Sequence, residues 1–72
     1  MQRYLIVIEG NGTGNYSAYS PDVPGCVATG DTRQETEARM RDALALHIES
    51  LREHDEAVPE ASSSAAYVEI PT

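Results

Sequence analysis

The segment from Tyr16 to Thr32 constrains the fold of this chain more than any other part of the sequence. Its first five residues alternate along the chain with the period of two that is typical of a β-strand. Pro21 and Pro24 follow, and each fixes its own φ angle and lacks an N–H donor, so the chain must leave the sheet there. A second strand begins after the turn and ends at a Gly-Asp-Thr sequence. The segment therefore predicts two strands joined by a rigid turn.

The rest of the sequence predicts one strand before this segment, and a helix and a strand after it. Residues 2–9 hold a continuous apolar run, which is typical of a strand covered on both faces. The sequence from Thr32 to Glu35 is a capping box, and apolar residues at helical spacing extend the helix to about Glu53. An acidic and then Ser/Ala-rich loop over 55–65 precedes a last strand over 66–70.

The expected fold class is therefore α+β, in one domain over residues 1–72 with the order β-β-β-α-β. The short connection between the first two strands indicates a small, mainly antiparallel sheet, and the single apolar stripe of the helix indicates that it packs on one face.

Size and composition favour a protein that associates with itself. A chain of 72 residues buries a small core and is marginally stable alone, and one cysteine cannot form an internal disulfide. The first strand is apolar on both faces, while only one helix is available to cover it. We therefore expect a homo-oligomer, either a dimer or a tetramer. The lone thiol fits a cytoplasmic location, and no apolar run is long enough for a signal peptide or a membrane span.

The charge balance is strongly acidic, with twelve Asp and Glu against five Arg and a net charge of −7. Such a surface repels phosphate backbones, because nucleic-acid affinity comes mainly from cationic contacts. We therefore expect no direct binding of nucleic acid. The same balance attracts a basic partner and accelerates its association.

Two patterns invite a reading as enzyme chemistry. A Gly-rich loop over 10–14 follows a strand, but a phosphate-binding loop needs a helix after it, and here a second strand follows. Cys26 and His47 could serve as nucleophile and base, but the sequence offers no third group to orient them. A hairpin loop and two packed side chains are the simpler interpretations, and we expect no catalytic or cofactor-binding residues.

Metal-dependent chemistry is no better supported. His47 and His54 are seven residues apart, which places them about 10 Å apart along a helix, too far to share one ion without further donors. A nuclease would gather several carboxylates around two magnesium ions. The carboxylates that lie near strand ends have local roles in a turn or at a helix start, so we expect no metal site; they are Glu9, Asp22, Asp31 and Glu69.

The pattern Y-S-A-Y-x-P-D-x-P-G-C-x-A-x-G-D-T over residues 16–32, with the amphipathic helix after it, closely resembles the HicB-like antitoxin family. The resemblance implies a small sandwich of strands and one helix, similar to part of a ribonuclease-H sheet, that forms dimers or larger assemblies. It also implies a partner: a small, basic, HicA-like toxin that cuts mRNA and whose active site the antitoxin blocks. Many relatives carry an added C-terminal DNA-binding domain, and no helix-turn-helix follows the last predicted strand here, so a role in repression is not expected.

This resemblance, joined to the acidic balance, predicts an antitoxin of a type II toxin–antitoxin system that acts by occlusion. Asp22 lies on the rigid turn, and the residues expected to face cationic groups of the toxin with it form an acidic patch at the helix end: Glu49, Glu53, Asp55 and Glu56. Tyr19 and Val23 are candidate apolar anchors, with packing against the sheet as their alternative role. The alternative function is an oligomeric module of the same fold that has no toxin partner and acts as a binding or scaffolding protein.

Overall fold

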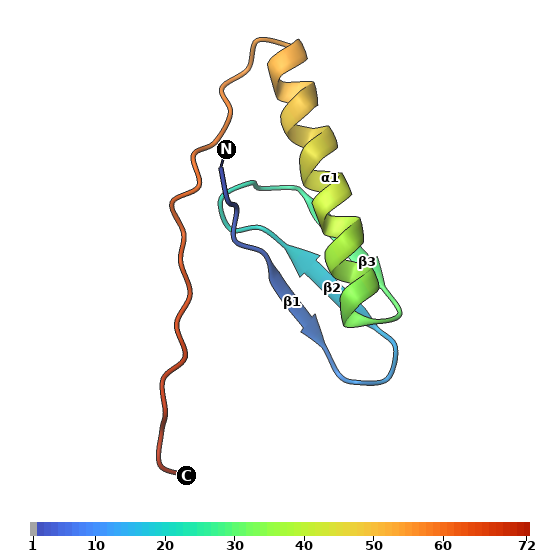
Figure 1. The fold of residues 1–72 in the computed structure, drawn as a ribbon, viewed down its shortest axis with the longest axis vertical. Coiled ribbons are helices and arrows are strands. Elements are labelled where there is room, and N and C mark those ends of the chain that lie inside the picture. The colour runs from blue at the N-terminus through green and yellow to red at the C-terminus, as the bar shows by residue number, and fades with distance from the viewer. Residues whose placement is uncertain (1) are drawn as a thin grey trace.

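The computed structural model describes residues 2–72 of the chain. Three short strands form an antiparallel sheet in the order β1-β2-β3, with β1 at Val7–Gly10, β2 at Tyr16–Tyr19 and β3 at Val27–Gly30. A single helix, α1 at Arg33–Glu53, lies across one face of this sheet (Figure 1). The predicted α+β class and the order β-β-β-α are confirmed.

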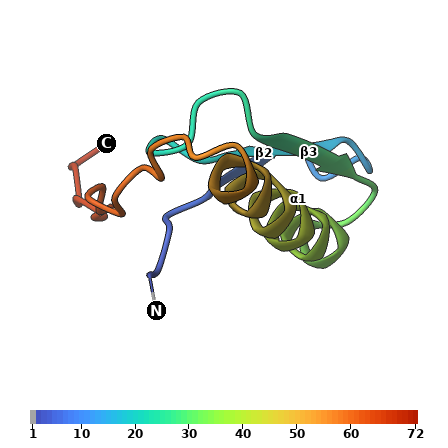
Figure 2. The same ribbon diagram turned by 90° about the horizontal axis from the view of Figure 1, so that it is seen from above.

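The register of the sheet decides which side chains meet the helix. Ile8 lies opposite Ala18, which lies opposite Ala28, and residues that pair directly share one face of the sheet. This row joins the core, whose most buried members are Ala18, Val23, Cys26 and Met40. Figure 2 shows α1 against this face only. Within residues 2–72, no helix covers the opposite face.

The turn between β2 and β3 is closed by its own backbone. The N–H of Val23 donates to the carbonyl of Ser20 at 3.2 Å, and the N–H of Cys26 donates to the carbonyl of Val23 at 3.3 Å. Gly25 has a φ of 85°, which a residue with a Cβ adopts only with strain. The result is the rigid turn that the two prolines predict.

The first strand is shorter than the expected span of residues 2–9, because β1 begins at Val7. The register places Leu5 opposite Pro21, which has no N–H to continue the ladder. The hydroxyl of Ser20 donates to the Leu5 carbonyl instead, at 2.8 Å. The regular pairing therefore stops at the point where the partner strand turns away.

The helix begins with the predicted capping box, but the second of the two hydrogen bonds differs from the expected one. The Thr32 hydroxyl accepts from the N–H of Glu35 at 3.0 Å, as a capping box requires. The Glu35 carboxylate, however, accepts from the N–H of Asp31 at 3.4 Å and not from that of Thr32. The same Glu35 oxygen also pairs with Arg39 at 3.0 Å.

The helix ends one residue before His54, at the predicted place. Asp55 has a φ of 54°, and this left-handed residue lets the N–H of Glu56 donate to the carbonyl of Leu51 at 2.8 Å. That six-to-one bond is the Schellman arrangement, which satisfies a carbonyl of the last turn and stops the helix.

The strand expected over residues 66–70 is a wrong prediction for this chain. The C-terminal tail, which we define as residues 57–72, contains no strand and runs as an extended segment beyond β1 (Figure 1). Its first part is anchored: the Tyr4 hydroxyl donates to the Pro59 carbonyl at 2.5 Å, and the N–H of Ala61 donates to the Gln2 side chain at 2.8 Å. A strand needs a neighbouring backbone to pair with, and residues 66–70 have none within the described chain.

Candidate partner-binding surfaces

A row of apolar side chains crosses the uncovered face of the sheet. Val7 lies opposite Tyr19, and Tyr19 lies opposite Val27, so the three side chains stand side by side on the face away from the helix. Tyr19 is 43% exposed and Val27 is 66% exposed. We call this row the outer-face stripe. A contiguous exposed apolar patch of this kind marks an interaction surface more often than isolated apolar residues do.

The sequence singled out Tyr19 from this stripe but not its two neighbours. The signal was present, because the alternation in each strand and a short β1–β2 connection together fix which residues share a face. Val27 lies next to Cys26, and in the sequence the two look alike, although Cys26 points into the core and Val27 points to solvent.

Val23 does not stand at the surface. Its side chain is 1% exposed and belongs to the core cluster, where it packs with Met40 and Ala18. The turn folds this residue inward because its two flanking prolines cannot extend the sheet. The structure therefore gives Val23 the packing role that the sequence offered as its alternative.

The carboxylate of Asp22 is held by the tail of its own chain. It accepts hydrogen bonds from the backbone N–H of Ser63 at 2.9 Å and of Ser62 at 3.0 Å, and from the hydroxyls of Ser63 at 2.7 Å and Ser62 at 3.2 Å. The Ser63 N–H contributes most to lowering the pKa of Asp22 below its ordinary value of 3.8, because all four donors favour the charged form. The contacts with residues 40 positions away left no local signal in the sequence.

The acidic helix end is exposed, as expected. Its four carboxylates, Glu49, Glu53, Asp55 and Glu56, all stand in solvent on the last turns of α1 and on its cap. Both ion pairs found within residues 2–72 lie in the first half of the helix, between Glu35 and Arg39 and between Glu37 and Arg41, so they do not neutralise this patch.

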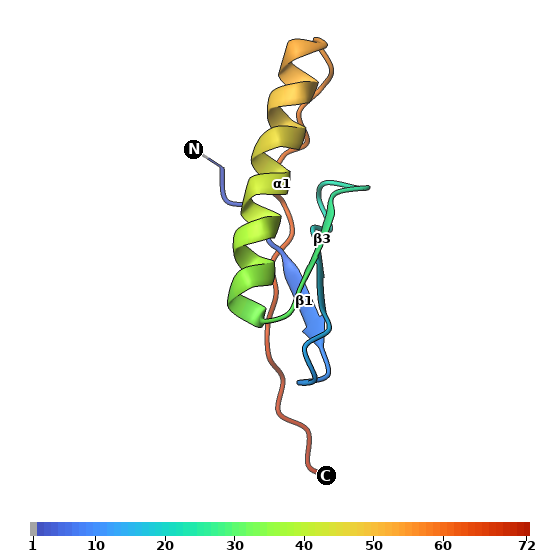
Figure 3. The same cartoon turned by 90° about the vertical axis from the view of Figure 1, so that its right-hand side faces the viewer.

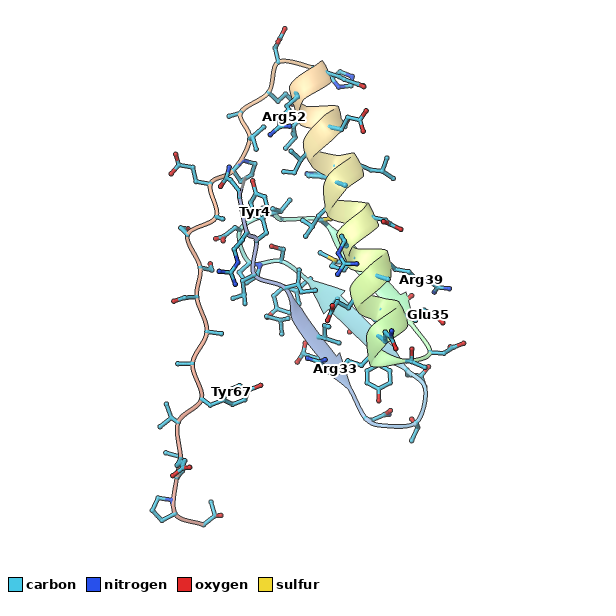
Figure 4. All side chains as sticks on the ribbon, in the orientation of Figure 1. Tyr4, Arg33, Glu35, Arg39, Arg52 and Tyr67 are labelled. Carbon is cyan, nitrogen blue, oxygen red and sulfur yellow. The ribbon has the colours of Figure 1, made fainter. Side chains whose placement is uncertain are left out.

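A groove of about 670 Å³ borders this acidic end. Its lining combines two residues before β1 with three apolar and two charged residues of α1: Gln2 and Tyr4; Leu44, Ala45 and Ile48; Glu49 and Arg52. Figure 4 shows Tyr4 and Arg52 at this end of the molecule. The structure does not join the acidic helix end to Asp22, since the β2–β3 turn lies about halfway down the helix and the acidic cap lies at its far end (Figure 1).

The chemistry of the other candidate groups is unfavourable for catalysis. The Cys26 thiol is 5% exposed, and burial raises its pKa, so it stays protonated at neutral pH and is a poor nucleophile.

In the part of the chain that the structure describes, no three His, Cys, Asp or Glu side chains gather closely enough to hold a metal ion. The glycine-rich loop after β1 leads into β2, not into a helix. No helix among the described residues has the length and apolar character needed to cross a membrane.

The strand order, the capped helix and the rigid turn all lie within a region that matches a known family. A family model described as the HicB-like antitoxin of bacterial toxin–antitoxin systems matches residues 4–72. The chain belongs to the HicB-like antitoxin family. The match spans the residues of the sheet, the helix and the tail of this HicB-like chain.

Three relatives are similar over most of the chain. An uncharacterized 14.9 kDa protein from the rep-hol intergenic region of Haemophilus phage HP1 is 38% identical over 68 residues, which cover 94% of this chain and 50% of the phage protein. The chain thus spans about half the length of that relative. A UPF0150 protein of Thermoplasma acidophilum is 33% identical over 79% of this chain and 83% of its own length. A UPF0150 protein of Synechocystis is 36% identical over 78% of this chain and 71% of its own. No solved structure is a significant match.

Proposed function

We propose that this HicB-like chain is an antitoxin that works in the cytoplasm by binding a small, basic, HicA-like toxin and covering the surface with which the toxin holds mRNA. Family membership over residues 4–72 is the observation that carries the proposal. The chain acts by occlusion and performs no chemistry of its own.

The acidic helix end supports this proposal through its charge. A toxin that grips RNA presents cationic side chains, because phosphate contacts supply most of the affinity for nucleic acid. Glu49, Glu53, Asp55 and Glu56 offer those cations a carboxylate surface that no ion pair within residues 2–72 neutralises. Exposed charges of this kind mainly accelerate the encounter and make its rate sensitive to salt.

Tyr19 supplies the apolar component of the proposed contact. A tyrosine that stands partly exposed between two apolar neighbours can lose its remaining water on binding, and aromatic residues are enriched among those that dominate binding energy. Asp22 takes part through its negative charge alone, because four donors of the tail already occupy its oxygens.

The electrostatic part is tested by charge reversal with a matched control. The variant Glu49→Lys, Glu53→Lys, Glu56→Lys should slow association with a basic, HicA-like toxin by about tenfold or more at low salt. The control reverses three exposed acids elsewhere, Glu9, Asp42 and Glu60, and changes the net charge equally. Stopped-flow mixing over a range of salt concentrations measures both.

A long-range effect of net charge alone would slow both variants equally, and that result would contradict a specific role for the helix end. Inhibition is measured separately, as protection of an RNA substrate and as relief of growth arrest on co-expression. If no short basic protein is encoded beside this chain, or if the wild-type chain neither binds such a protein nor relieves its toxicity, the antitoxin proposal is wrong, and the alternative of an oligomeric module without a toxin is favoured.

The anchor role of Tyr19 has its own test. Tyr19→Ala should weaken toxin binding by about tenfold to a hundredfold in Kd, mostly through faster dissociation, since truncation of a central aromatic contact commonly has that effect. Tyr16→Ala is not a suitable control, because the Tyr16 ring packs over Gly10. Leu46→Ala is suitable, since Leu46 is 68% exposed on α1. Equal losses in the two variants would rule out Tyr19 as an anchor.

A further inference from the structure

The edge of β1 faces a groove that separates it from the chain's own tail. The sheet order leaves β1 at one edge, with a row of backbone N–H and C=O groups that no strand pairs. The groove has a volume of about 660 Å³. One side is lined by residues 3–8, of which the last two belong to β1, and the other by Ser63, Ser64, Ala65 and Tyr67 of the tail, with Arg33 and Glu37 of α1 also bordering it. The tail thus runs past β1 without touching its edge.

The outer part of the tail is an extended segment without a partner. Residues 64–72 are all exposed, and none makes a hydrogen bond within the described chain beyond the anchors that end at Ser63. Tyr67 is 105% exposed, Val68 76% and Ile70 67%. Apolar side chains in an extended segment with unpaired backbone groups are favourable for pairing with another strand and unfavourable in water.

The direction of the tail defines what can enter the groove. In Figures 1 and 3 the tail descends beyond β1 in the same sense as β1 itself. A strand placed between them in the opposite sense would therefore be antiparallel to both of its neighbours. The pairing on both sides would use the ordinary antiparallel hydrogen-bond pattern.

We propose that the tail of a second copy of this chain fills this groove, and that the two copies exchange tails about a two-fold axis. The order across the dimer is then β3-β2-β1 of one copy, the tail of the second copy, the tail of the first, and β1-β2-β3 of the second. A two-fold axis between the tails makes them antiparallel, so the eight strands form one continuous antiparallel sheet. Each tail lies one strand away from its own β1, which is where the single chain already holds it.

The side chains around the groove fit this occupant. The incoming tail carries Glu69, and the groove lining holds two guanidinium groups, of Arg3 and Arg33, against one carboxylate, Glu37, which already pairs with Arg41. Figure 4 shows Tyr67 projecting from the tail toward the sheet, at the height of Arg33. The anchors at Asp22, with Ser62 and Ser63, fix where the tail passes β1 and so limit the entropy lost when a second tail enters.

Backbone pairing is tested with a proline in the tail. Val68→Pro removes one N–H and fixes φ, so it should convert a dimer into a monomer at micromolar concentration. Val68→Thr keeps the N–H and a β-branched side chain and should leave the dimer intact. Neither change touches the core, so circular dichroism should give the same helix content for both. Light scattering coupled to size-exclusion chromatography measures the mass.

The position of the two tails is tested by crosslinking. If the two-fold axis passes beside the middle of this segment, one of residues 67, 68 and 69 lies opposite its own counterpart, and a cysteine there comes within the Cα separation of about 4.4–6.8 Å that a disulfide spans. At least one of the three single-cysteine variants should form a disulfide-linked dimer under mild oxidation. Asp42→Cys, exposed on α1, is the matched control and should not.

A monomeric wild-type chain would overturn the proposal. So would a dimer that survives Val68→Pro, or one that none of the tail cysteines crosslinks, since its interface would lie elsewhere. The proposal of tail exchange does not depend on toxin binding. A tail-exchanged dimer that binds no toxin would reject the antitoxin proposal alone, and a monomeric chain that neutralises a toxin would reject tail exchange alone.

Discussion

The close approach of α1 to β3 at Gly30 supplies the sharpest test of how this fold is held together. A Cβ added at Gly30 would lie 2.6 Å from the Thr36 hydroxyl oxygen and 3.1 Å from the Thr36 nitrogen. Thr36 is 0% exposed, and its hydroxyl donates to the Thr32 carbonyl at 2.7 Å, so it cannot turn away into solvent. Overpacking at such a place costs about 1–3 kcal/mol, so Gly30→Ala should destabilise the chain by that amount.

The magnitude is large for a protein of this size. A chain of 72 residues has a total stability of only about 4–11 kcal/mol, and each kcal/mol lost lowers Tm by about 4–8 °C. Gly30→Ala should therefore lower Tm by about 5–20 °C. Thr36→Ala alone should cost about 1–2 kcal/mol, because it removes one hydrogen bond and one buried methyl group.

A double-mutant cycle separates this clash from other effects. In a Thr36→Ala background the nearest obstacle is gone but the backbone nitrogen of residue 36 stays at 3.1 Å, so Gly30→Ala should cost less but not nothing, which gives a coupling of about 1 kcal/mol between the two sites. Gly25→Ala is the matched control: its cost arises from a φ of 85° and not from a neighbour, so Thr36→Ala should not reduce it. Thermal and urea unfolding measure all variants. If Gly30→Ala costs the same in both backgrounds, the clash is not the reason that glycine occupies this position.

Three further results are expected. Met40→Ala, at a side chain that is 0% exposed, should cost about 2–5 kcal/mol in urea unfolding, and a cost near zero would mean that the core lies elsewhere. The pKa of Asp22 is lowered, so the stabilisation from its bonds to the tail is fully present above pH 3.8 and is lost as pH falls through the lower pKa of the folded state. The NMR resonance of the Ser63 amide should therefore titrate with a midpoint below 3.8. The variant Asp22→Asn should abolish that titration. Val7→Glu, which places a charge in the outer-face stripe, should weaken assembly or folding, and unchanged mass and Tm would show that this face stays in solvent.

The parts of the fold that could be predicted are those that short-range chemistry specifies. The rigid turn follows from two prolines and one glycine, and the helix start follows from Thr32 and Glu35, because each group acts on a neighbour within a few residues. The extent of β1 required knowledge of its partner: Leu5 looks like strand but lies opposite Pro21, and only the register reveals that.

The parts that could not be predicted depend on contacts across the whole chain. The sequence predicts that Asp22 is a free carboxylate on a turn. Its hydrogen-bond donors, however, lie about 40 residues later in a serine-rich segment that carries no recognisable motif. Residues 66–70 alternate like a strand, but alternation says nothing about whether a neighbouring backbone exists. Val23 sits between two prolines in a polar turn, and its burial follows from the direction in which the turn folds. The sequence pointed to Tyr19 and to the acidic helix end, which both lie at the surface, but it could not reveal that the tail binds Asp22 or which of its two expected roles Val23 takes.

The distribution of surface chemistry would let one small chain serve the two partners proposed for it. Most of its exposed large apolar side chains lie in the outer-face stripe and in the tail, whereas four exposed acids lie together at the far end of α1. Tail exchange would join two copies through β1 and leave both helix ends in solvent, because α1 lies on the opposite side of the sheet from the stripe (Figure 2). A dimer of this kind presents two acidic ends and two Tyr19 side chains, so it offers two equivalent toxin sites. Self-association and toxin binding then add to one another and do not compete, and the tail that the single chain leaves unpaired becomes the element that links the two sites.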